Sequence, residues 1–308
     1  MICSTVLDAL GGTPVVRLRR VVPAGSAEVV VKFEGLGVGG SVKTRTAWNM
    51  VEQATRRGQI GPDTIIVEPT SGNQGIGLAL VAAVRGLRCR IVMPDSVSVE
   101  RRQIIQAYGA EVVLVHDGGD IGQCIDECLQ TALAMAAADP NVFVPQQFAN
   151  PDNPAVHEAT TARELVDQVG RPIDGFCAGI GTGGTITGIG RVLRRECPGV
   201  VIWAVEPEQA AILSGGPIGS HVQMGIGDGL IPANLDQSVY SDVAVVTDEE
   251  AVTMARRLAR EEGLLCGISS GSNVVAALRL AQHLGAGKLV ATLLPDTGER
   301  YFSTPLFA

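Results

Sequence analysis

Short apolar runs alternate with amphipathic stretches along the whole chain. The apolar runs predict strands at residues 28–34, 63–68, 87–94, 110–115, 173–181, 201–207 and 288–295. The amphipathic stretches predict helices at residues 42–58, 73–86, 99–109, 121–137, 153–170, 185–197, 249–263 and 272–285. Because unbroken apolar strands need cover on both faces, the alternation predicts an α/β protein with a parallel sheet.

One segment interrupts this alternation. Residues 145–154, PQQFANPDNP, are rich in Pro and Asn and suggest a joint between two halves of the chain. Open α/β sheets bind their ligands beyond the carboxyl ends of the strands. The residues that follow each predicted strand are therefore the first candidates for chemistry.

Composition narrows the class of protein. Of 308 residues, 46% are hydrophobic and 18% are charged, which is typical of a well-packed globular chain. The 38 glycines and the aromatic content of only 4% favour many tight strand-to-helix turns. A net charge of −8, without a dense basic block, argues against nucleic acids and acidic membranes as partners.

The cysteines and the most apolar segment indicate the cellular compartment in which the protein is expected. The seven cysteines lack the spacing of zinc ligands, so we expect free thiols, no metal site and a cytoplasmic protein. The most apolar segment, residues 75–93, is interrupted by Arg85, Arg88 and Arg90 and is too short to span a membrane. We expect neither a signal peptide nor a transmembrane segment.

Three turns rich in Gly, Ser and Thr each open a predicted helix. Residues 181–188, GTGGTITG, have almost no side-chain bulk, so their backbone N–H groups and hydroxyls suit a phosphate. Residues 70–75, TSGNQG, suit either a bound carboxylate or an ordinary helix cap. Residues 267–271, GISSG, cap the helix at 272–285 and offer Ser269 as a neutral hydrogen-bond partner. All three turns can face one cleft.

Two of these turns also match motifs of other enzyme classes. GIGTGG satisfies G-x-G-x-x-G at Gly179, Gly181 and Gly184, and a ribose-binding acid would lie near Glu206, which indicates an NAD-binding unit. GISSG matches the nucleophile elbow of serine hydrolases, whose histidine follows the acid in the chain. No histidine follows Asp296, so the hydrolase reading is disfavoured.

A single lysine, Lys43, stands between a glycine cluster and an apolar run in GVGGSVKTRTAWNM. The preceding residue Ser41 is a candidate cap for the helix at 42–58. The helix dipole disfavours a charged lysine in the first turn, so its amine is better placed if neutral or bound as an imine. A lysine for an imine, cradles for a phosphate and a carboxylate, and a neutral serine favour pyridoxal phosphate over a nicotinamide.

Seven motifs follow one another along the chain: GGSVKTR, EPTSGNQGIGLA, QQFANPDNP, GTGGTITG, GIGDGLIPANLD, EEGLLCGISSGSN and LPDTGERYFST. Together they resemble the cysteine synthase family of fold type II pyridoxal-phosphate enzymes, which includes O-acetylserine sulfhydrylase and cystathionine β-synthase. The likeness runs from LGGTPVVRL to the last residues, with no sign of an appended regulatory domain. It implies a tryptophan synthase β-like fold of two doubly wound α/β domains, with the active site in the cleft between them.

The resemblance also implies domain boundaries and residue roles. The N-terminal domain would comprise residues 1–12 and 36–150, and the C-terminal domain residues 13–35 and 151–308. Lys43 is similar to the catalytic Schiff-base lysine, Asn73 to the partner of the cofactor's ring hydroxyl, and Ser269 to the partner of the pyridine nitrogen. The implied phosphate loop consists of Gly181, Thr182, Gly183, Gly184 and Thr185. The implied clamp on the substrate carboxylate consists of Thr70, Ser71, Gly72, Gln74 and Gln147.

The implied activity is that of a pyridoxal-phosphate-dependent transferase of cysteine biosynthesis. O-acetyl-L-serine would displace Lys43, whose freed amine would remove the α-proton as general base. The β-substituent would leave, and sulfide would add to the aminoacrylate intermediate to give L-cysteine. The implied partners are a small amino-acid substrate, a second copy of the chain in a homodimer, and serine acetyltransferase.

The chain departs from the family's pattern near the site. It has Gly37 and Val38 in place of Asn-Pro, Thr44 in place of Asp, and Gln74 in place of Thr. Asp228 stands in the loop where relatives that use O-phosphoserine tend to carry an arginine, which favours an uncharged ester such as O-acetylserine.

These departures keep alternative functions open. Relatives with specialised nucleophiles also vary in this loop, and LLPDTGERYFSTPLF is similar to O-ureidoserine synthase relatives. The first alternative is therefore β-replacement with an amine, urea-like or thiol nucleophile, which gives a non-proteinogenic β-substituted alanine. Alternatives of another class are an NAD-binding oxidoreductase and a non-catalytic binding relative.

Overall fold

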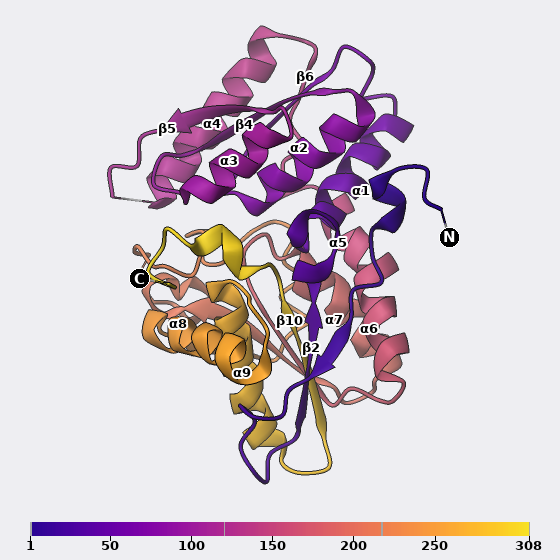
Figure 1. Ribbon diagram of the computed structural model, residues 1–308, viewed down its shortest axis with the longest axis vertical. Coiled ribbons are helices and arrows are strands. Elements are labelled where there is room, and N and C mark those ends of the chain that lie inside the picture. The colour runs from indigo at the N-terminus through magenta and orange to yellow at the C-terminus, as the bar shows by residue number, and fades with distance from the viewer. Residues whose placement is uncertain (1, 120, 217, 308) are drawn as a thin grey trace.

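The computed structural model describes residues 2–119, 121–216 and 218–307. Its strands form two sheets, one above the other in Figure 1. The four-stranded sheet has the order β5-β4-β3-β6 and the six-stranded sheet the order β1-β2-β10-β7-β8-β9. Among the described residues, every pairing is parallel except that of β1 with β2.

The four-stranded sheet is built from the first half of the chain. Its strands are β3 (Ile65–Pro69), β4 (Arg88–Pro94), β5 (Glu111–Val115) and β6 (Val142–Phe143). Helices α1 (Lys43–Arg56), α2 (Asn73–Arg85) and α3 (Val99–Ala107) lie on one side, and α4 (Ile121–Ala138) packs on β3 and β4 from the other.

The six-stranded sheet combines an early hairpin with the second half of the chain. Its strands are β1 (Val15–Arg17), β2 (Glu28–Phe33), β7 (Gly175–Gly179), β8 (Val201–Pro207), β9 (Asp242–Val246) and β10 (Leu289–Leu294). Helices α8 (Asp248–Arg257) and α9 (Ile268–Leu284) cover one face, and α6 (Ala162–Val169) and α7 (Gly184–Glu196) cover the other. The short helix α5 (Asp152–Val156) follows the joint and packs on α1 and α7.

Both sheets are buried on two faces because their strands are apolar at consecutive positions. On β3, Ile66 packs into the core beneath α2, and its neighbour Val67 packs against α4. On β2, Val30 and Val31 likewise enter cores on opposite faces of the larger sheet. The predicted fold class, two doubly wound α/β sheets, is therefore confirmed.

Several elements differ from the prediction. The short strands β1, β6 and β9 were not predicted, because few residues carry their apolar pattern. The predicted helices at 153–170 and 249–263 are each broken by a π-helical turn, at His157–Thr161 and Leu258–Glu262. A π turn inserts a residue without ending the helix, so apolar spacing alone does not locate it.

Two helix starts also differ. Ser41 does not cap α1: the N-cap is Val42, no side chain caps this end, and the buried Ser41 hydroxyl has no hydrogen-bond partner in the described part of the chain. Ser41 instead pairs in an isolated bridge with Asp296, which holds it in extended backbone. Helix α9 begins at Ile268, so most of the GISSG segment lies inside its first turn. Across the described residues, no helix combines the length and the hydrophobicity needed to cross a membrane.

Candidate active site

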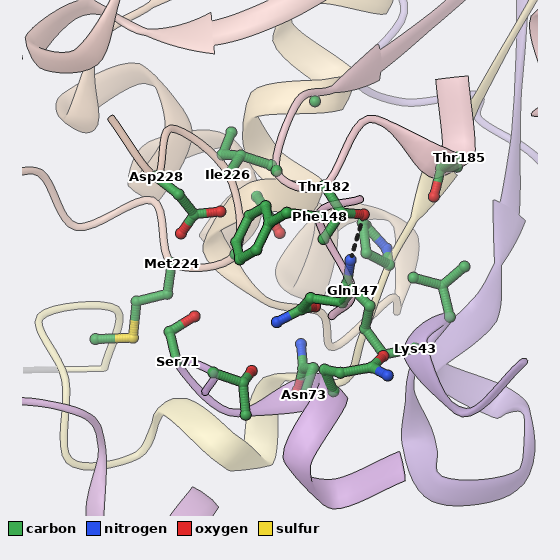
Figure 2. A pocket seen from close by; sticks show the side chains of 18 of the residues that line it. Lys43, Ser71, Asn73, Gln147, Phe148, Thr182, Thr185, Met224, Ile226 and Asp228 are labelled. Carbon is green, nitrogen blue, oxygen red and sulfur yellow. Dashed lines mark hydrogen bonds between the residues drawn. The ribbon is translucent and has the colours of Figure 1, made fainter. Parts of the chain in front are cut away.

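A deep cleft lies where the carboxyl ends of strands in both sheets meet. It encloses about 1030 Å³ of space between protein atoms, open solvent at its mouth included. The three predicted turns all contribute to its wall, through Thr70 and Ser71, through residues 181–183, and through Ser269. Figure 2 shows Ser71 and Asn73 entering the cleft opposite Asp228 and Ile226.

The amine of Lys43 lies inside this cleft. Lys43 is the first residue of α1, and its Nζ donates a 3.2 Å hydrogen bond to Thr182 Oγ1, the dashed line in Figure 2. Burial lowers the pKa of Lys43 to about 8, against an opposing effect of Asp228. The chain has three lysines, and the other two pair with carboxylates. Within the described residues Lys43 has no such partner, so it is the lysine free for chemistry.

The turn from Gly181 to Thr185, the predicted phosphate loop, leads into the start of α7. Gly183 is the N-cap and has a φ of 76°, a left-handed conformation that favours glycine. A Cβ at Gly181 would collide with the Gly225 carbonyl, and one at Gly184 would collide with Asn153. The first N–H groups of α7 have no partner within the helix, so this crowded turn presents them to a ligand.

Two polar side chains from the α5 region support this turn. Asn153 Nδ2 donates to Thr182 Oγ1 at 2.9 Å and to the Gln147 carbonyl at 2.8 Å, which ties this turn to the segment that carries Gln147. His157 Nε2 lies 3.4 Å from Thr185 Oγ1. Burial, followed by the charges of Arg45 and Lys43, lowers the pKa of His157 to about 3, so its imidazole is neutral.

The predicted carboxylate clamp is assembled from two separate turns. Thr70, Ser71, Gln74 and Gln147 line the cleft together. Gln74 is 1% exposed, and neither its amide oxygen nor its amide nitrogen has a hydrogen-bond partner among the described residues. Since buried polar groups are normally paired, this amide is positioned for a ligand.

Gln147 is held in place by Glu68 at the end of β3. The Glu68 carboxylate accepts hydrogen bonds from the backbone N–H groups of Gln146, at 2.9 Å, and Gln147, at 2.8 Å. Gln146 has a φ of 59° and is the only non-glycine residue of the described chain with a positive φ. Burial raises the pKa of Glu68 to about 7, although the two backbone hydrogen bonds oppose the shift.

Asn73 is fixed by residues far away in the sequence. Its Nδ2 donates to Asp296 Oδ2 at 2.6 Å, and its Oδ1 accepts from Arg300 Nη1 at 2.6 Å. Tyr301 donates its hydroxyl to the same Asp296 oxygen at 2.7 Å. The amide of Asn73 therefore has a fixed orientation at the wall of the cleft, with one N–H left for a ligand.

Ser269 lies in the first turn of α9, at the base of the cleft. It is 4% exposed, and no hydrogen bond of its hydroxyl is found among the described residues. A hydroxyl donates or accepts as its partner requires, so it accommodates a ring nitrogen without imposing a charge on it.

Two predicted site residues do not line the cleft. Gly72 lies within the Thr70–Gln74 carboxylate loop with a φ of 145°, and a Cβ there would collide with the Arg101 side chain. Gly184 lies behind the phosphate turn against Asn153. Both are needed for close packing of the loops. All the other predicted site residues reach the cleft.

The sequence reasoning did not find the residues that position the site: Glu68, Arg101, Asn153, His157, Asp296 and Arg300. Asp228, which the sequence singled out for its charge, lines the cleft without a hydrogen-bond partner among the described residues. Burial raises its pKa, while Lys43 and His221 oppose the shift. An acidic residue near the end of an apolar strand, such as Glu68, is a sequence signal that could have indicated one of these residues.

The NAD-binding alternative is not supported at its acidic position. Glu206 lies at the carboxyl end of β8, near the position that the motif requires. Its two carboxylate oxygens, however, accept hydrogen bonds from the backbone N–H groups of Leu213, at 2.8 Å, and Ser214, at 3.0 Å. The carboxylate is 2% exposed and occupied by its own chain. It is not presented to a ribose.

Comparisons with known proteins place the chain among enzymes. The family model described as "Pyridoxal-phosphate dependent enzyme" matches residues 6–296. A cysteine synthase of Staphylococcus aureus is 48% identical over 307 residues, which cover 98% of this chain and 96% of that protein. The crystal structure of O-ureido-L-serine synthase superposes with a TM-score of 0.94 at 43% identity, covering 100% of this chain and 96% of that one. O-acetylserine-dependent cystathionine β-synthase of Helicobacter pylori gives a TM-score of 0.93 at 37% identity, with 100% of both chains covered.

Proposed function

We propose that this chain, which belongs to the pyridoxal-phosphate-dependent enzyme family, is a cysteine synthase. It replaces the β-substituent of O-acetyl-L-serine with sulfide to give L-cysteine. One observation carries the proposal: the Nζ of Lys43 lies 3.2 Å from the Oγ1 of Thr182 in the predicted phosphate loop. Lys43 has no carboxylate partner in the described chain. The same cleft is lined by Ser269 and by Gln74, whose buried amide has no hydrogen-bond partner among the described residues.

The residues present fit pyridoxal phosphate. The glycine turn at the start of α7 leaves its N–H groups open, and the buried Ser269 hydroxyl lacks a partner among the described residues. Gly181–Thr185 would hold the phosphate, Asn73 the ring hydroxyl and Ser269 the ring nitrogen. When bound, the cofactor supplies an aldehyde to which Lys43 attaches and a ring that withdraws electrons from the substrate.

Lys43 is the acid–base group of the proposed reaction. A pKa of about 8 means that a substantial fraction of its amine is neutral near neutral pH, as a base requires. The hydrogen bond to Thr182 Oγ1 limits the orientations of Nζ. Lys43 Nζ takes the proton from the substrate Cα.

The carboxylate loop orients the amino acid for this proton transfer. Thr70 and Ser71 offer hydroxyls and the start of α2 offers N–H groups, all suited to a carboxylate. The amides of Gln74 and Gln147 complete the wall. Because Gly72 has no side chain, the Thr70–Gln74 loop can pass close to the Arg101 side chain.

A second candidate function is β-replacement with a polar nucleophile such as an amine, a urea-like molecule or a thiol. It is favoured by the buried, unpartnered amide of Gln74, a larger and more polar group than sulfide needs. The similarity to O-ureido-L-serine synthase also supports a polar nucleophile. Sulfide remains the proposed nucleophile because the cysteine synthase relative shares more of the sequence.

The test is a matrix of donors and nucleophiles with the holoenzyme. O-acetyl-L-serine and O-phospho-L-serine are each combined with sulfide, hydroxyurea and L-homocysteine, and the products are identified by mass. We expect the fastest product to be L-cysteine from the acetyl ester. Lys43→Ala should reduce turnover by about 10²–10⁴-fold, whereas the exposed Lys288→Ala should leave it unchanged. A borohydride-reduced digest that carries the cofactor on Lys32 or Lys288 would contradict the assignment of Lys43.

Three finer proposals accompany the activity. The domain boundaries follow the sheets, since β1 and β2 pair beside β10 although they precede α1 in the chain. All seven cysteines are free thiols, which supports a reducing cytoplasm. A homodimer and an association with serine acetyltransferase follow from the resemblance, and light scattering of the protein alone and in mixture tests both.

A further inference from the structure

A buried arginine lines the cleft next to the carboxylate loop. Arg101 lies on α3, is 1% exposed, and contributes to the same wall as Ser71 and Met224. Its stem packs behind Gly72, so its position is fixed relative to the loop. Its guanidinium lies over the ring of Tyr301, 4.5 Å from the ring centre.

No carboxylate among the described residues forms an ion pair with the guanidinium of Arg101; the neighbouring Glu100 acts on it only through space, and its carboxylate oxygens accept hydrogen bonds from Ser303 instead. Its Nη1 contacts Ser98 Oγ at 3.3 Å and the Met224 sulfur at 2.6 Å, and its other nitrogens have no acceptor there. A hydroxyl, a thioether and an aromatic ring compensate a positive charge weakly. Another buried arginine, Arg45, instead pairs with two carboxylates.

An unpaired buried charge is unfavourable unless an anion completes its environment. We propose that Arg101 forms an anion subsite of the cleft, which binds a small carboxylate other than the one held by the Thr70–Gln74 loop. The inference rests on the proposed function, because that function assigns the loop to the amino acid's own carboxylate. Two sources supply a second carboxylate: the acetate that leaves from the donor, and the carboxylate of an amino-acid nucleophile.

The first experiment measures binding, with acetate as the probe and calorimetry of the holoenzyme at constant ionic strength. L-alanine at saturation occupies the carboxylate loop throughout. We expect acetate to bind the wild type and Arg101→Lys, and to bind Arg101→Gln about tenfold more weakly, since a charge-assisted hydrogen bond is lost. Arg102→Gln is the matched control on the same helix, because Arg102 bonds the Val97 carbonyl and does not line the cleft.

Three results would overturn the subsite: no acetate binding to the alanine-saturated wild type, equal binding to Arg101→Gln, or an equal loss in Arg102→Gln. If Arg101→Gln fails to fold, the absence of acetate binding to the alanine-saturated wild type would still overturn the subsite. A failed proposed function is seen separately, as absence of β-replacement by an enzyme in which acetate binding still depends on Arg101.

Steady-state kinetics then distinguish the two sources. If the subsite receives the nucleophile's carboxylate, Arg101→Gln should raise KM for L-homocysteine about tenfold and leave KM for sulfide unchanged. If it receives the leaving acetate, product inhibition by acetate should weaken by a similar factor and both KM values should stay. No change in any of the three quantities would contradict a role in the reaction.

Discussion

Two side chains in the cleft, Lys43 and Gln74, lack the partners that their buried polar groups would normally have. Lys32 is fully buried yet pairs with Glu164 at 2.8 Å, whereas the amine of Lys43 meets only a hydroxyl. The amide of Gln74 has no partner among the described residues. Leaving such groups unpaired destabilises the fold, and a ligand bound in the cleft would pair with both of them.

Replacing Gln74 tests whether this amide selects the nucleophile. Gln74→Thr shortens the side chain and removes the amide from the carboxylate loop. We expect kcat/KM for the best polar nucleophile to fall by about tenfold or more, and the sulfide reaction to be kept or improved. Equal effects on both nucleophiles, measured with one batch of enzyme, would mean that the residue supports the loop without selecting.

The pKa of Lys43 gives a prediction for the apoenzyme. Acylation by acetic anhydride requires the neutral amine, so labelling of Lys43 should rise with pH and be half complete near pH 8. Asp228→Asn removes the carboxylate that raises this pKa, so its midpoint should shift to lower pH. Peptide mass spectrometry measures the labelling, with Lys288 as the internal reference. An unchanged or higher midpoint in Asp228→Asn would contradict the coupling.

At the scale of elements, the site is made where turns from different parts of the chain meet. The start of α2 carries Asn73, but the segment after β10 fixes its amide through Asp296 and Arg300. Ser98 at the start of α3 donates to the Arg300 carbonyl at 2.9 Å, so the same segment also holds α3. The C-terminal segment thus joins two helices of the four-stranded sheet to a strand of the six-stranded sheet.

Replacing Asp296 tests this arrangement. Asp296→Ala removes the acceptor of Asn73 and Tyr301, so the amide of Asn73 loses its orientation. We expect the apoenzyme to bind pyridoxal phosphate about tenfold or more weakly, as measured by absorbance titration. Asp296→Asn is the matched control, because its amide oxygen can still accept both hydrogen bonds, and it should lose less. Wild-type affinity in Asp296→Ala would show that Asn73 is oriented by other contacts.

At the scale of the whole molecule, a buried ion network connects the two sheet systems. Arg45 on α1 pairs with Glu34, which follows β2, at 2.7 Å and with Glu164 on α6. Lys32 on β2 also forms an ion pair with Glu164, at 2.8 Å. Burial alone would raise the pKa of Glu164, but hydrogen bonds from Arg45 and Lys32 lower it to about 2. The network therefore anchors the helix that begins with Lys43 to the larger sheet.

Arg45→Met should test the strength of this anchor. It leaves Glu34, which is 1% exposed, without its cation, so we expect a loss of about 3–5 kcal/mol in the free energy of unfolding. Because the folded pKa of Glu164 is lowered, its contribution is complete above pH 4.5 and is lost as pH falls towards 2. The difference between variant and wild type should shrink over that range in urea titrations. The exposed Arg57→Met, which also breaks an ion pair on α1, should have a much smaller effect.

The sequence by itself determined the elements and the chemistry of the turns. Apolar spacing located the long helices and most strands, and the glycine turn at 181–185 predicted an anion site, because backbone conformation is set by neighbouring residues. Lys43 was found for the same reason, since its helix start and its glycines are local features.

The tertiary structure alone decided which groups are paired. Asn73 meets Asp296 across 223 positions of sequence, and Arg101 lies against Met224 across 123 positions. The sequence presented Ser41 as a helix cap, yet a backbone bridge to Asp296 displaced it from that role. Burial, and with it the pKa of Lys43 and the isolation of Arg101, arises only when the two sheets come together, because desolvation depends on every group that surrounds a charge.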